Sequence, residues 1–312
     1  MSETSGMAWD GQEGVIPGSD EPAFRFSRLD EPALPVLIAV PHAGRVYPSQ
    51  LRERMRQPGW SSLRLEDRYV DALARKIATA TGAALLVANA PRAMIDLNRA
   101  RDDLDWSMIA GGAGARQPDS IANRRARSGL GLVPRRLPGL GEIWKDRIGR
   151  EELTARIESV HRPYHRRLGR TLENIRDVWG AALLIDLHSM PPLKSGAGCG
   201  KPAEFVIGDR FGASCDAVLS ARAIDHIGKA GRQVAHNRPY SGGYVLDTHA
   251  APSRGIHALQ IEICRSTYLD ARLDVPGPRL PTIARLLTGM IQTLAEDVAR
   301  MGSGDALAFA AE

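Results

Sequence analysis

Hydrophobic and polar positions along the chain alternate between two patterns. Short apolar runs, typical of strands, occur at 35–42, 84–91, 93–100, 181–188, 203–209, 233–237, 242–249 and 258–265. Longer stretches with apolar residues three and four positions apart predict helices at 65–82, 150–179, 215–230 and 280–301. Pro163 should kink or split the second of these helices. Strands that alternate with helices predict a layered α/β fold.

The chain is expected to form one large domain over residues 23–302, because 312 residues with 43% hydrophobic content can bury a sizeable core. Residues 1–22 are polar and Gly-rich, which predicts a disordered N-terminal tail, and residues 303–312 are expected to be a flexible C-terminal tail. Residues 110–141 are dense in Gly, Pro and Arg, so we expect a long surface loop there. This insertion is either a lid over an anionic ligand or a solvated basic excursion.

The composition limits the cellular compartment and the kinds of binding partner that we expect. The net charge of +5 is too mild to indicate a nucleic acid partner, although the predominance of arginine suits a small anionic substrate. Cys199, Cys215 and Cys264 lack CxxC spacing, which favours a reduced, cytoplasmic setting. The first residues lack the pattern of a signal peptide, and no apolar run approaches the roughly 20 residues of a membrane helix, so no membrane partner is expected. The sequence does not indicate an oligomeric state.

Side chains that could bind a metal or catalyse a reaction stand near the expected ends of three apolar runs. His42 follows the first run, Asp186 and His188 close another, and Glu262 interrupts a third. The carboxyl ends of strands in open α/β sheets meet in one crevice, so these groups should converge. Two histidines and a carboxylate there predict a metal site, with Asp186 able to orient the His188 imidazole.

The third metal ligand and the role of Glu262 stay open at this point. A catalytic zinc site generally needs three protein ligands, and Glu66 or Asp67 could supply the carboxylate. Glu262 lies in a run that otherwise reads as buried, so it is either a general base or the ion-pair partner of an arginine such as Arg265.

Two further segments are rich in groups that can bind an anion, and one histidine pair has a metal-like spacing. Candidate ligand-binding residues in these segments are Arg92, Asn98, Arg99, Asn237, Arg238, Tyr240, Ser241 and Tyr244. Solvated loops of similar composition are common. His161 and His165 have the i, i+4 spacing of zinc peptidases, but Arg162 replaces the catalytic glutamate of that motif and Pro163 disturbs the turn, so packing is the better interpretation.

Seven motifs in order, PHAG, ED with RYVDALA, PRAMIDLNR, PYH, LIDLHSMP, NRPYSGGY and ALQIEICR, resemble those of the N-formylglutamate amidohydrolase family over roughly residues 35–294. The resemblance implies a three-layer α/β/α fold with a mixed central sheet, similar to zinc carboxypeptidases and aspartoacylases, and one catalytic divalent metal, most simply Zn²⁺. It implies hydrolysis of an N-acyl amino acid such as N-formylglutamate, as part of amino-acid catabolism such as histidine degradation.

The resemblance also assigns roles to individual residues. The implied metal ligands are His42, Asp67 and His188, with Glu66 in reserve. The implied catalytic groups are Glu262 as general base and Arg92 at the carbonyl oxygen. The implied substrate-binding residues are Asn98 and Arg99, joined by Asn237, Ser241 and Tyr244 from the later turn. The chain departs from the carboxypeptidase HxxE pattern, because Arg45 stands three residues after His42.

Two other functions remain alternatives to this reading. A carboxypeptidase-like enzyme or amidase would keep the fold and the metal and would act on a peptide or another acylated substrate. A non-catalytic anion or nucleic acid binder would contain no stoichiometric metal and would bind in a strongly salt-dependent way.

Overall fold

The structure, a computed structural model, describes residues 9–10, 13–27, 32–111, 126, 128–194 and 201–304. The strands are β1 (Trp9–Asp10), β2 (Phe24–Ser27), β3 (Val36–Val40), β4 (Ala84–Ala88), β5 (Arg136–Leu137), β6 (Gly141–Glu142), β7 (Ala182–Met190), β8 (Phe205–Gly208), β9 (Val234–His236) and β10 (Ile256–Cys264). The α-helices are α1 (Ser49–Glu53), α2 (Pro58–Leu65), α3 (Val70–Thr81), α5 (Arg150–Arg156), α6 (Arg162–Trp179), α7 (Ala217–Lys229), α8 (Tyr244–His249) and α9 (Leu280–Gly302). Short helical turns lie at Trp106–Met108, Ile157–His161, Pro252–Arg254 and Arg265–Thr267.

A mixed central sheet forms the middle layer. Within the described residues its strand order is β1-β2-β4-β3-β7-β10-β8-β9. The four central strands β4, β3, β7 and β10 run parallel, while β2 and β8 run antiparallel to their inner neighbours. The predicted α/β/α class with a mixed sheet is therefore confirmed.

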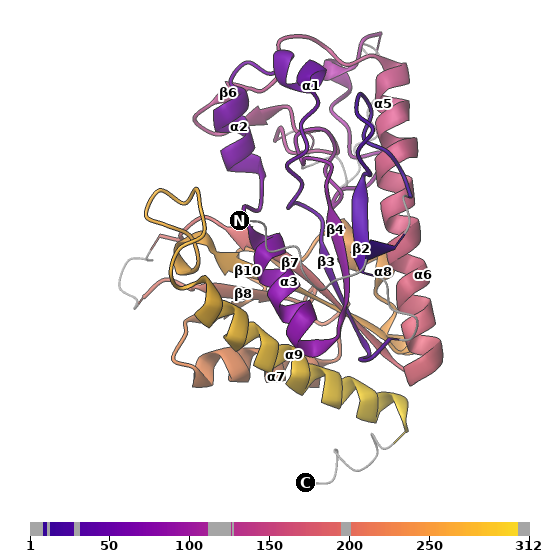
Figure 1. The fold of residues 1–312 in the computed structure, drawn as a ribbon, viewed down its shortest axis with the longest axis vertical. Coiled ribbons are helices and arrows are strands. Elements are labelled where there is room, and N and C mark those ends of the chain that lie inside the picture. Colours follow the sequence, from indigo (N-terminus) through magenta and orange to yellow (C-terminus); the bar gives the residue numbers. More distant parts are fainter. Residues whose placement is uncertain are drawn as a thin grey trace.

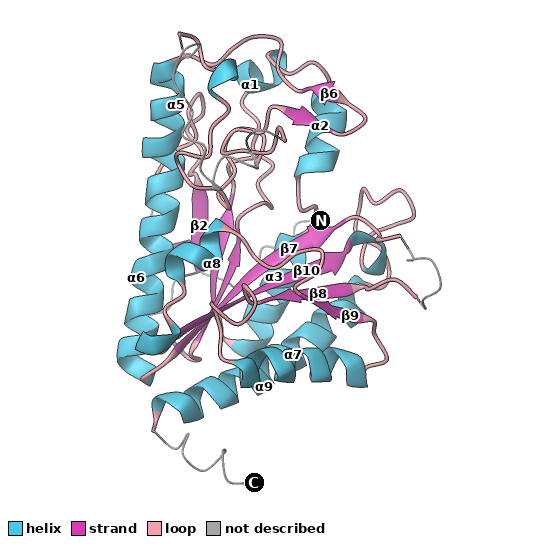
Figure 2. Ribbon diagram, turned by 180° about the vertical axis from the view of Figure 1, so that it is seen from behind, coloured by secondary structure: helices cyan, strands magenta, loops and turns pink. Residues whose placement is uncertain are grey.

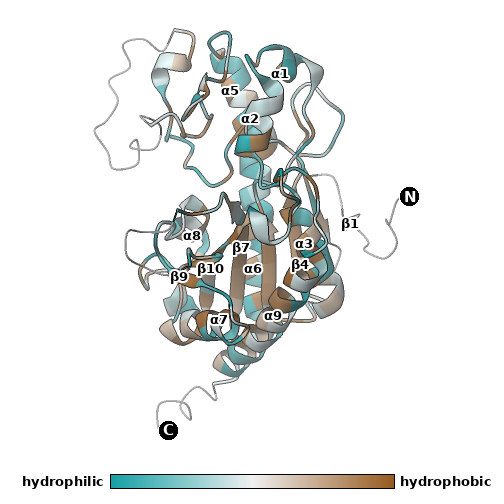
Figure 3. Ribbon diagram, turned by 90° about the vertical axis from the view of Figure 1, so that its left-hand side faces the viewer, coloured by the Kyte–Doolittle hydropathy of each residue, from teal (hydrophilic) through white to brown (hydrophobic). Residues whose placement is uncertain are grey.

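Helices cover both faces of the sheet. Helices α3, α7 and α9 pack together on one face, and α6 and α8 lie on the other (Figures 1 and 2). Strands β3, β4, β7 and β10 are buried along their whole length, as expected for parallel strands between helical layers. The strands are accordingly the most hydrophobic part of the molecule, whereas the helices carry mixed surfaces (Figure 3).

The two faces of β7 and β10 differ in a way that positions the site. Leu183, Ile185 and Leu187 point into the core beneath α3, α7 and α9. On the opposite face, Ala182 and Leu184 belong to the second core, and the same row then becomes polar at Asp186 and His188. The change from apolar to polar side chains on one face marks the carboxyl end of the sheet as the place for chemistry.

The long helix over 150–179 forms as predicted, and Pro163 does not break it. A π-helical turn at Ile157–His161 joins α5 to α6, and Pro163 lies in the first turn of α6. Proline is tolerated at such a position because the N–H that it lacks has no obligatory partner there. The π turn, whose hydrogen bonds span five residues instead of four, joins the two helices in a continuous helical path.

Three element predictions were wrong. The helix expected over 65–82 is split, because α2 ends at Leu65 and Tyr69 adopts a left-handed backbone with φ 57° before α3 begins. Residues 93–100 form turns rather than a strand, with short-range bonds such as Met94 N to Pro91 O at 2.8 Å and Arg99 N to Asp96 O at 3.2 Å. The strand expected over 242–249 is helix α8, whose Val245 N donates to the side chain of Asn98.

The predicted tails and loop also need correction. Within residues 1–22, β1 pairs with β2 and Ile16 is fully buried, so the described part of this stretch belongs to the domain. Leu132, Val133 and Leu137 join the core, so the second half of the predicted surface loop packs against the protein. Residues 112–125, and the prediction of a lid there, lie outside the described residues, as do residues 305–312 of the predicted C-terminal tail.

The structure can be compared with two expectations from the sequence, one about membrane helices and one about the cysteines. None of the described helices is both long enough and apolar enough to cross a bilayer. Cys215 and Cys264 are free thiols, and Cys199 lies outside the described residues. The cytoplasmic setting stays a prediction.

Candidate metal centre

Loops and strand ends from distant parts of the chain bring His42, Asp67 and His188 together. One potential ligand atom from each lies within 4.8 Å of the others, and all three side chains are buried. His42 lies two residues beyond β3, and Asp67 N donates to His42 O at 2.9 Å, which fixes one ligand-bearing turn against the other. Gly44 is required beside this turn because a Cβ atom there would lie 2.0 Å from Ala90 O.

Both imidazoles present Nδ1 to the same carboxylate oxygen. His188 Nδ1 lies 2.9 Å and His42 Nδ1 lies 3.5 Å from Asp67 Oδ2. The outer nitrogens are held by two further buried aspartates: His42 Nε2 donates to Asp96 Oδ1 at 2.7 Å, and His188 Nε2 donates to Asp186 Oδ2 at 2.9 Å. Because a carboxylate only accepts hydrogen bonds, these contacts place a proton on Nε2 and direct Nδ1 inward.

This arrangement fits a metal ion. His42 Nδ1 is buried and has no hydrogen-bond partner among the described residues, which is costly for a polar atom unless a ligand satisfies it. Carboxylates behind both histidines are the outer contacts that orient imidazole ligands in metal sites. Two imidazole nitrogens and one carboxylate form a donor set suited to zinc and leave positions open for water and substrate.

The charges around the cluster also suit a metal ion. Although burial acts against it, the hydrogen bond from His188 and the nearby imidazole of His42 hold the pKa of the Asp67 carboxyl below its usual range. Burial likewise acts against the charge on His188, but Asp186 and Asp67 raise the pKa of that imidazole well above its usual value. In the metal-free protein, a proton on His188 therefore balances the carboxylates, and a metal ion would displace it.

The structure separates the two candidates for the carboxylate ligand. Glu66 Oε2 accepts from Arg68 Nη1 at 2.8 Å and lies outside the cluster, whereas Asp67 faces both histidines. Asp67 is therefore the carboxylate ligand that the geometry favours.

Glu262 stands beside the cluster on the neighbouring strand. It pairs in register with His188 across β7 and β10, so the two side chains share one face of the sheet. Glu262 is 8% exposed, and its Oε1 accepts from Gln260 Nε2 at 3.1 Å. Burial raises the pKa of the Glu262 carboxyl to about 7. Arg265 instead bonds Ser189 and the backbone of Leu63 and Glu66, so the alternative of a Glu262–Arg265 ion pair is wrong.

Arg92 is tied to the cluster through Asp96. Its Nε donates to Asp96 Oδ2 at 2.9 Å, while the other oxygen of that carboxylate holds His42. The Nη groups of Arg92 make no hydrogen bond with any described residue, so they remain available to a ligand. One buried aspartate thus positions both a metal-ligand candidate and a free cationic donor.

The predicted substrate-binding residues have mostly structural contacts. Arg99 donates to Leu130 O and Asn98 O, and the side chain of Asn237 holds the backbone of Asp209 and Phe211. Asn98 Oδ1 accepts from Val245 N at 2.9 Å, and its Nδ2 lies 3.4 Å from His188 Nε2. Asn98 therefore stands at the edge of the cluster, whereas Arg99 and Asn237 support the backbone around it.

The remaining candidates come from the turn before α8 and from the histidine pair of α6. The backbone O of Ser241 accepts from Arg210 N at 2.8 Å, and Tyr244 packs its ring against His161 and His165. His161 Nε2 donates to Arg99 O and His165 Nε2 donates to Leu97 O. This pair holds the segment that carries Asn98, which supports the packing interpretation.

Sequence reasoning missed Asp96 and Gln260. Asp96 lies in a segment predicted as a strand, and nothing in its spacing shows that the chain turns it toward His42. Gln260 had a readable signal, because Gln260 and Glu262 alternate within an apolar strand and must therefore share a face.

Comparison with known proteins settles the family. A family model described as N-formylglutamate amidohydrolase matches residues 34–269, which is most of the chain and spans every residue of the cluster. The chain belongs to the N-formylglutamate amidohydrolase family. It is 30% identical over 270 residues to an N-formylglutamate deformylase of Pseudomonas putida, covering 84% of this chain and 94% of that protein. A deformylase of the same name from Pseudomonas aeruginosa is 27% identical over 282 residues, covering 86% and 94% of the two chains.

A solved structure within the family extends the likeness to three dimensions. The N-formylglutamate amidohydrolase of Ralstonia eutropha JMP134 superposes with a TM-score of 0.78 at 29% identity, covering 89% of this chain and 99% of the other. The family resemblance carried by the sequence motifs is therefore confirmed.

Proposed function

We propose that this protein hydrolyses the formyl amide of N-formyl-L-glutamate to formate and glutamate, with one zinc ion held by His42, Asp67 and His188. The observation that carries the proposal is the convergence of two Nδ1 atoms on Asp67 Oδ2, with Glu262 alongside, in a member of this family. Relatives that cover most of the chain bear the name of this activity, which supports the same reaction.

The protein's own groups account for the proton transfers. A bound zinc ion would lower the pKa of a water and polarise the acyl oxygen. Glu262 accepts the proton of the attacking water, because it is a buried carboxylate beside the cluster. It then returns this proton to the amide nitrogen as the C–N bond breaks, so that the products are formate and a free amine.

Arg92 stabilises the negative charge that develops on the carbonyl oxygen during the attack. Its guanidinium is fixed through Nε by Asp96 and presents free Nη donors beside the cluster. A donor held in place before the reaction needs no reorganisation in the transition state, and the loss of one such donor typically costs about 3 kcal/mol.

The test measures formate release from N-formylglutamate by the zinc-loaded protein, together with the metal content of each variant. Glu262→Gln should lower turnover by about 100- to 10,000-fold while it retains about one zinc per chain. Glu173→Gln is the matched control, because Glu173 pairs with Arg254 on the surface, at the amino end of β10, and should leave turnover unchanged. Full activity in Glu262→Gln, or no formate release by the wild type, would overturn the proposal.

A further inference from the structure

The carboxylate of Asp67 is also held on the side that faces away from the two histidines. Its Oδ1 accepts from Ser189 Oγ at 3.1 Å, and Arg265 Nη2 lies 3.6 Å from the same oxygen. Its Oδ2 is the oxygen that both imidazoles approach. All three of these side chains are buried, so their contacts are stronger than they would be in water. The proposed mechanism assigns no task to Ser189 or Arg265.

Arg265 determines the direction in which the Ser189 hydroxyl points. Arg265 Nε donates to Ser189 Oγ at 3.0 Å, and a guanidinium can donate but not accept. The Ser189 oxygen is therefore the acceptor in this bond, and its single proton is left for Asp67 Oδ1. The hydrogen bonds from Arg265 through Ser189 to Asp67 thus all run toward the carboxylate.

The other donors of Arg265 fix the turn that carries Asp67. Nη1 donates to Leu63 O at 3.0 Å, and Nη2 donates to Glu66 O at 2.6 Å. Leu63 lies in the last turn of α2, where carbonyl groups need partners from outside the helix. The rigid fork of a guanidinium can bind several such groups at once, which a flexible ammonium does less well. Arg265, the residue after β10, therefore joins the end of that strand to the turn before Asp67.

We propose that Ser189 and Arg265 are positioning residues for the metal, because they hold Asp67 Oδ1 so that Oδ2 stays turned toward His42 and His188. A buried guanidinium is costly unless its donors are satisfied, and Arg265 uses its donors on Ser189 and on this one turn. The inference rests on the metal site of the proposed function. The histidine ligands are held by acceptors, and the carboxylate ligand is held by donors.

The test measures zinc affinity by chelator competition, which requires no turnover. Ser189→Ala removes the hydroxyl that binds Oδ1 and should lower zinc affinity by about tenfold. Arg265→Lys keeps the charge but loses the fork, so the turn is also released, and zinc affinity should fall by about 10- to 100-fold. Cobalt(II) bound in place of zinc should show altered visible absorption bands in both variants, because these bands depend on the arrangement of the ligands.

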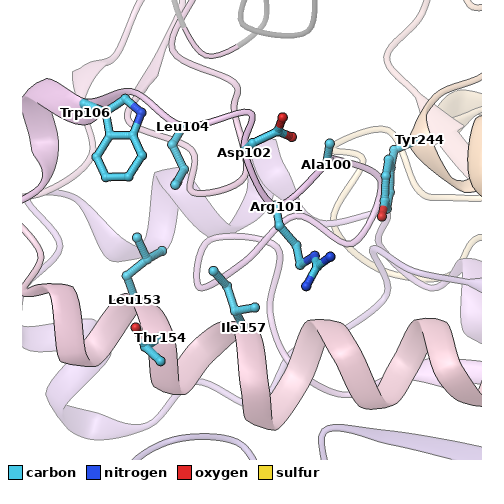
Figure 4. Close-up of a pocket in the computed structure, with 9 residues that line it drawn as sticks. All are labelled: Ala100, Arg101, Asp102, Leu104, Trp106, Leu153, Thr154, Ile157 and Tyr244. Carbon is cyan, nitrogen blue, oxygen red and sulfur yellow. The ribbon is translucent and has the colours of Figure 1, made fainter. Parts of the chain in front are cut away.

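Two control variants separate the positioning of Asp67 from a general loss of stability. Ser220→Ala removes another buried hydroxyl that donates to an aspartate, Asp209 Oδ2 at 2.7 Å, on α7 across the sheet. Leu153→Ala enlarges a cavity of about 640 Å³ that is lined by residues of α5 and of the segment 100–106 (Figure 4). No residue of the metal cluster lines this cavity, and neither does Ser189 or Arg265. Both controls should unfold more easily and keep zinc affinity within about twofold of wild type.

The outcomes distinguish the inference from the proposed reaction. Zinc affinity within about twofold of wild type in Ser189→Ala, or an equal loss of affinity in either control, would overturn the inference. If Arg265→Lys does not fold, Ser189→Ala decides alone. Zinc binding by the wild type without formate release would overturn the proposed reaction and leave the affinity comparison valid. A wild type that binds no zinc would overturn both.

Discussion

Asp96 should control both metal affinity and stability, because it holds two functional groups at once. It is fully buried and accepts from His42 Nε2 at 2.7 Å, Arg92 Nε at 2.9 Å and Asn98 N at 2.8 Å. In Asp96→Asn the amide oxygen can still accept from His42 and Asn98, but the new NH₂ group faces the Nε donor of Arg92. The variant thus keeps the shape of the side chain and loses its charge.

The magnitude follows from these contacts. A hydrogen bond to a charged group contributes about 1.5–3 kcal/mol, and the bond to His42 falls to roughly half its strength once the acceptor is neutral. We therefore expect the free energy of unfolding of the metal-free protein to fall by about 2–4 kcal/mol. Zinc affinity should fall by about 10- to 100-fold, the usual effect of losing a group that orients a histidine ligand.

Chelator competition would measure zinc affinity, and denaturant unfolding of the metal-free protein would measure stability. Asp297→Asn is the matched control, because Asp297 is also buried and accepts from two arginines, but on α9 across the sheet. It should lose stability and keep its zinc affinity. Zinc affinity in Asp96→Asn within about twofold of wild type would refute the role assigned to Asp96.

Four further outcomes follow from the same structure. Since burial raises the pKa of Glu262, kcat/KM of the zinc-loaded protein should rise with pH as this carboxyl loses its proton, and a profile that falls between pH 5 and about 7 would exclude Glu262 as the base. In the metal-free protein, protonated Glu262 stabilises the fold at pH values below the pKa that this carboxyl has in the unfolded chain, and the stabilisation is lost as the pH rises through about 7. Urea unfolding at pH 8 should therefore show that Glu262→Gln is more stable than the wild type. Tyr164→Phe should leave the free energy of unfolding unchanged or raise it by up to about 1 kcal/mol, because the Tyr164 hydroxyl is buried without a partner among the described residues. A lower free energy of unfolding in denaturant would instead show that this hydroxyl has a hydrogen-bond partner. Chelation should lower Tm, since free zinc at 100 times its Kd adds about 2.7 kcal/mol, and an unchanged Tm would argue against a site in the folded core.

The periodicity of apolar residues correctly predicted those strands and helices whose structure follows from their own local sequence. The runs that became β3, β7 and β10 are buried along their whole length and mostly apolar, and the 3.6-residue pattern of α6 and α9 extends over several turns. Such signals are local and strong. His42, His188 and Glu262 could be placed at one edge of the sheet because that edge follows from the parallel order of the strands.

The elements that were mispredicted depend on contacts between distant parts of the chain. Helix α8 begins where Asn98, 147 residues earlier, accepts the hydrogen bond of Val245 N. The turn that directs Asp67 toward His42 depends on a left-handed Tyr69 and on a backbone bond between Asp67 and His42. Neither contact leaves a trace in the hydrophobic pattern of its own segment, so a single sequence read by periodicity cannot supply it.

The segment after β4 shows how structure and chemistry are joined in this protein. Arg92, Asp96 and Asn98 all reach the cluster from it, yet it has no regular secondary structure of its own. His161 and His165 hold its carbonyl groups from α6, so the eye-catching histidine pair acts on the site from behind. With both Nε2 atoms committed to Arg99 O and Leu97 O, the pair cannot offer those nitrogens to a metal without releasing the segment. Spacing alone would favour a metal at this pair, whereas the hydrogen bonds assign it the task of keeping the groups around His42 and His188 in place.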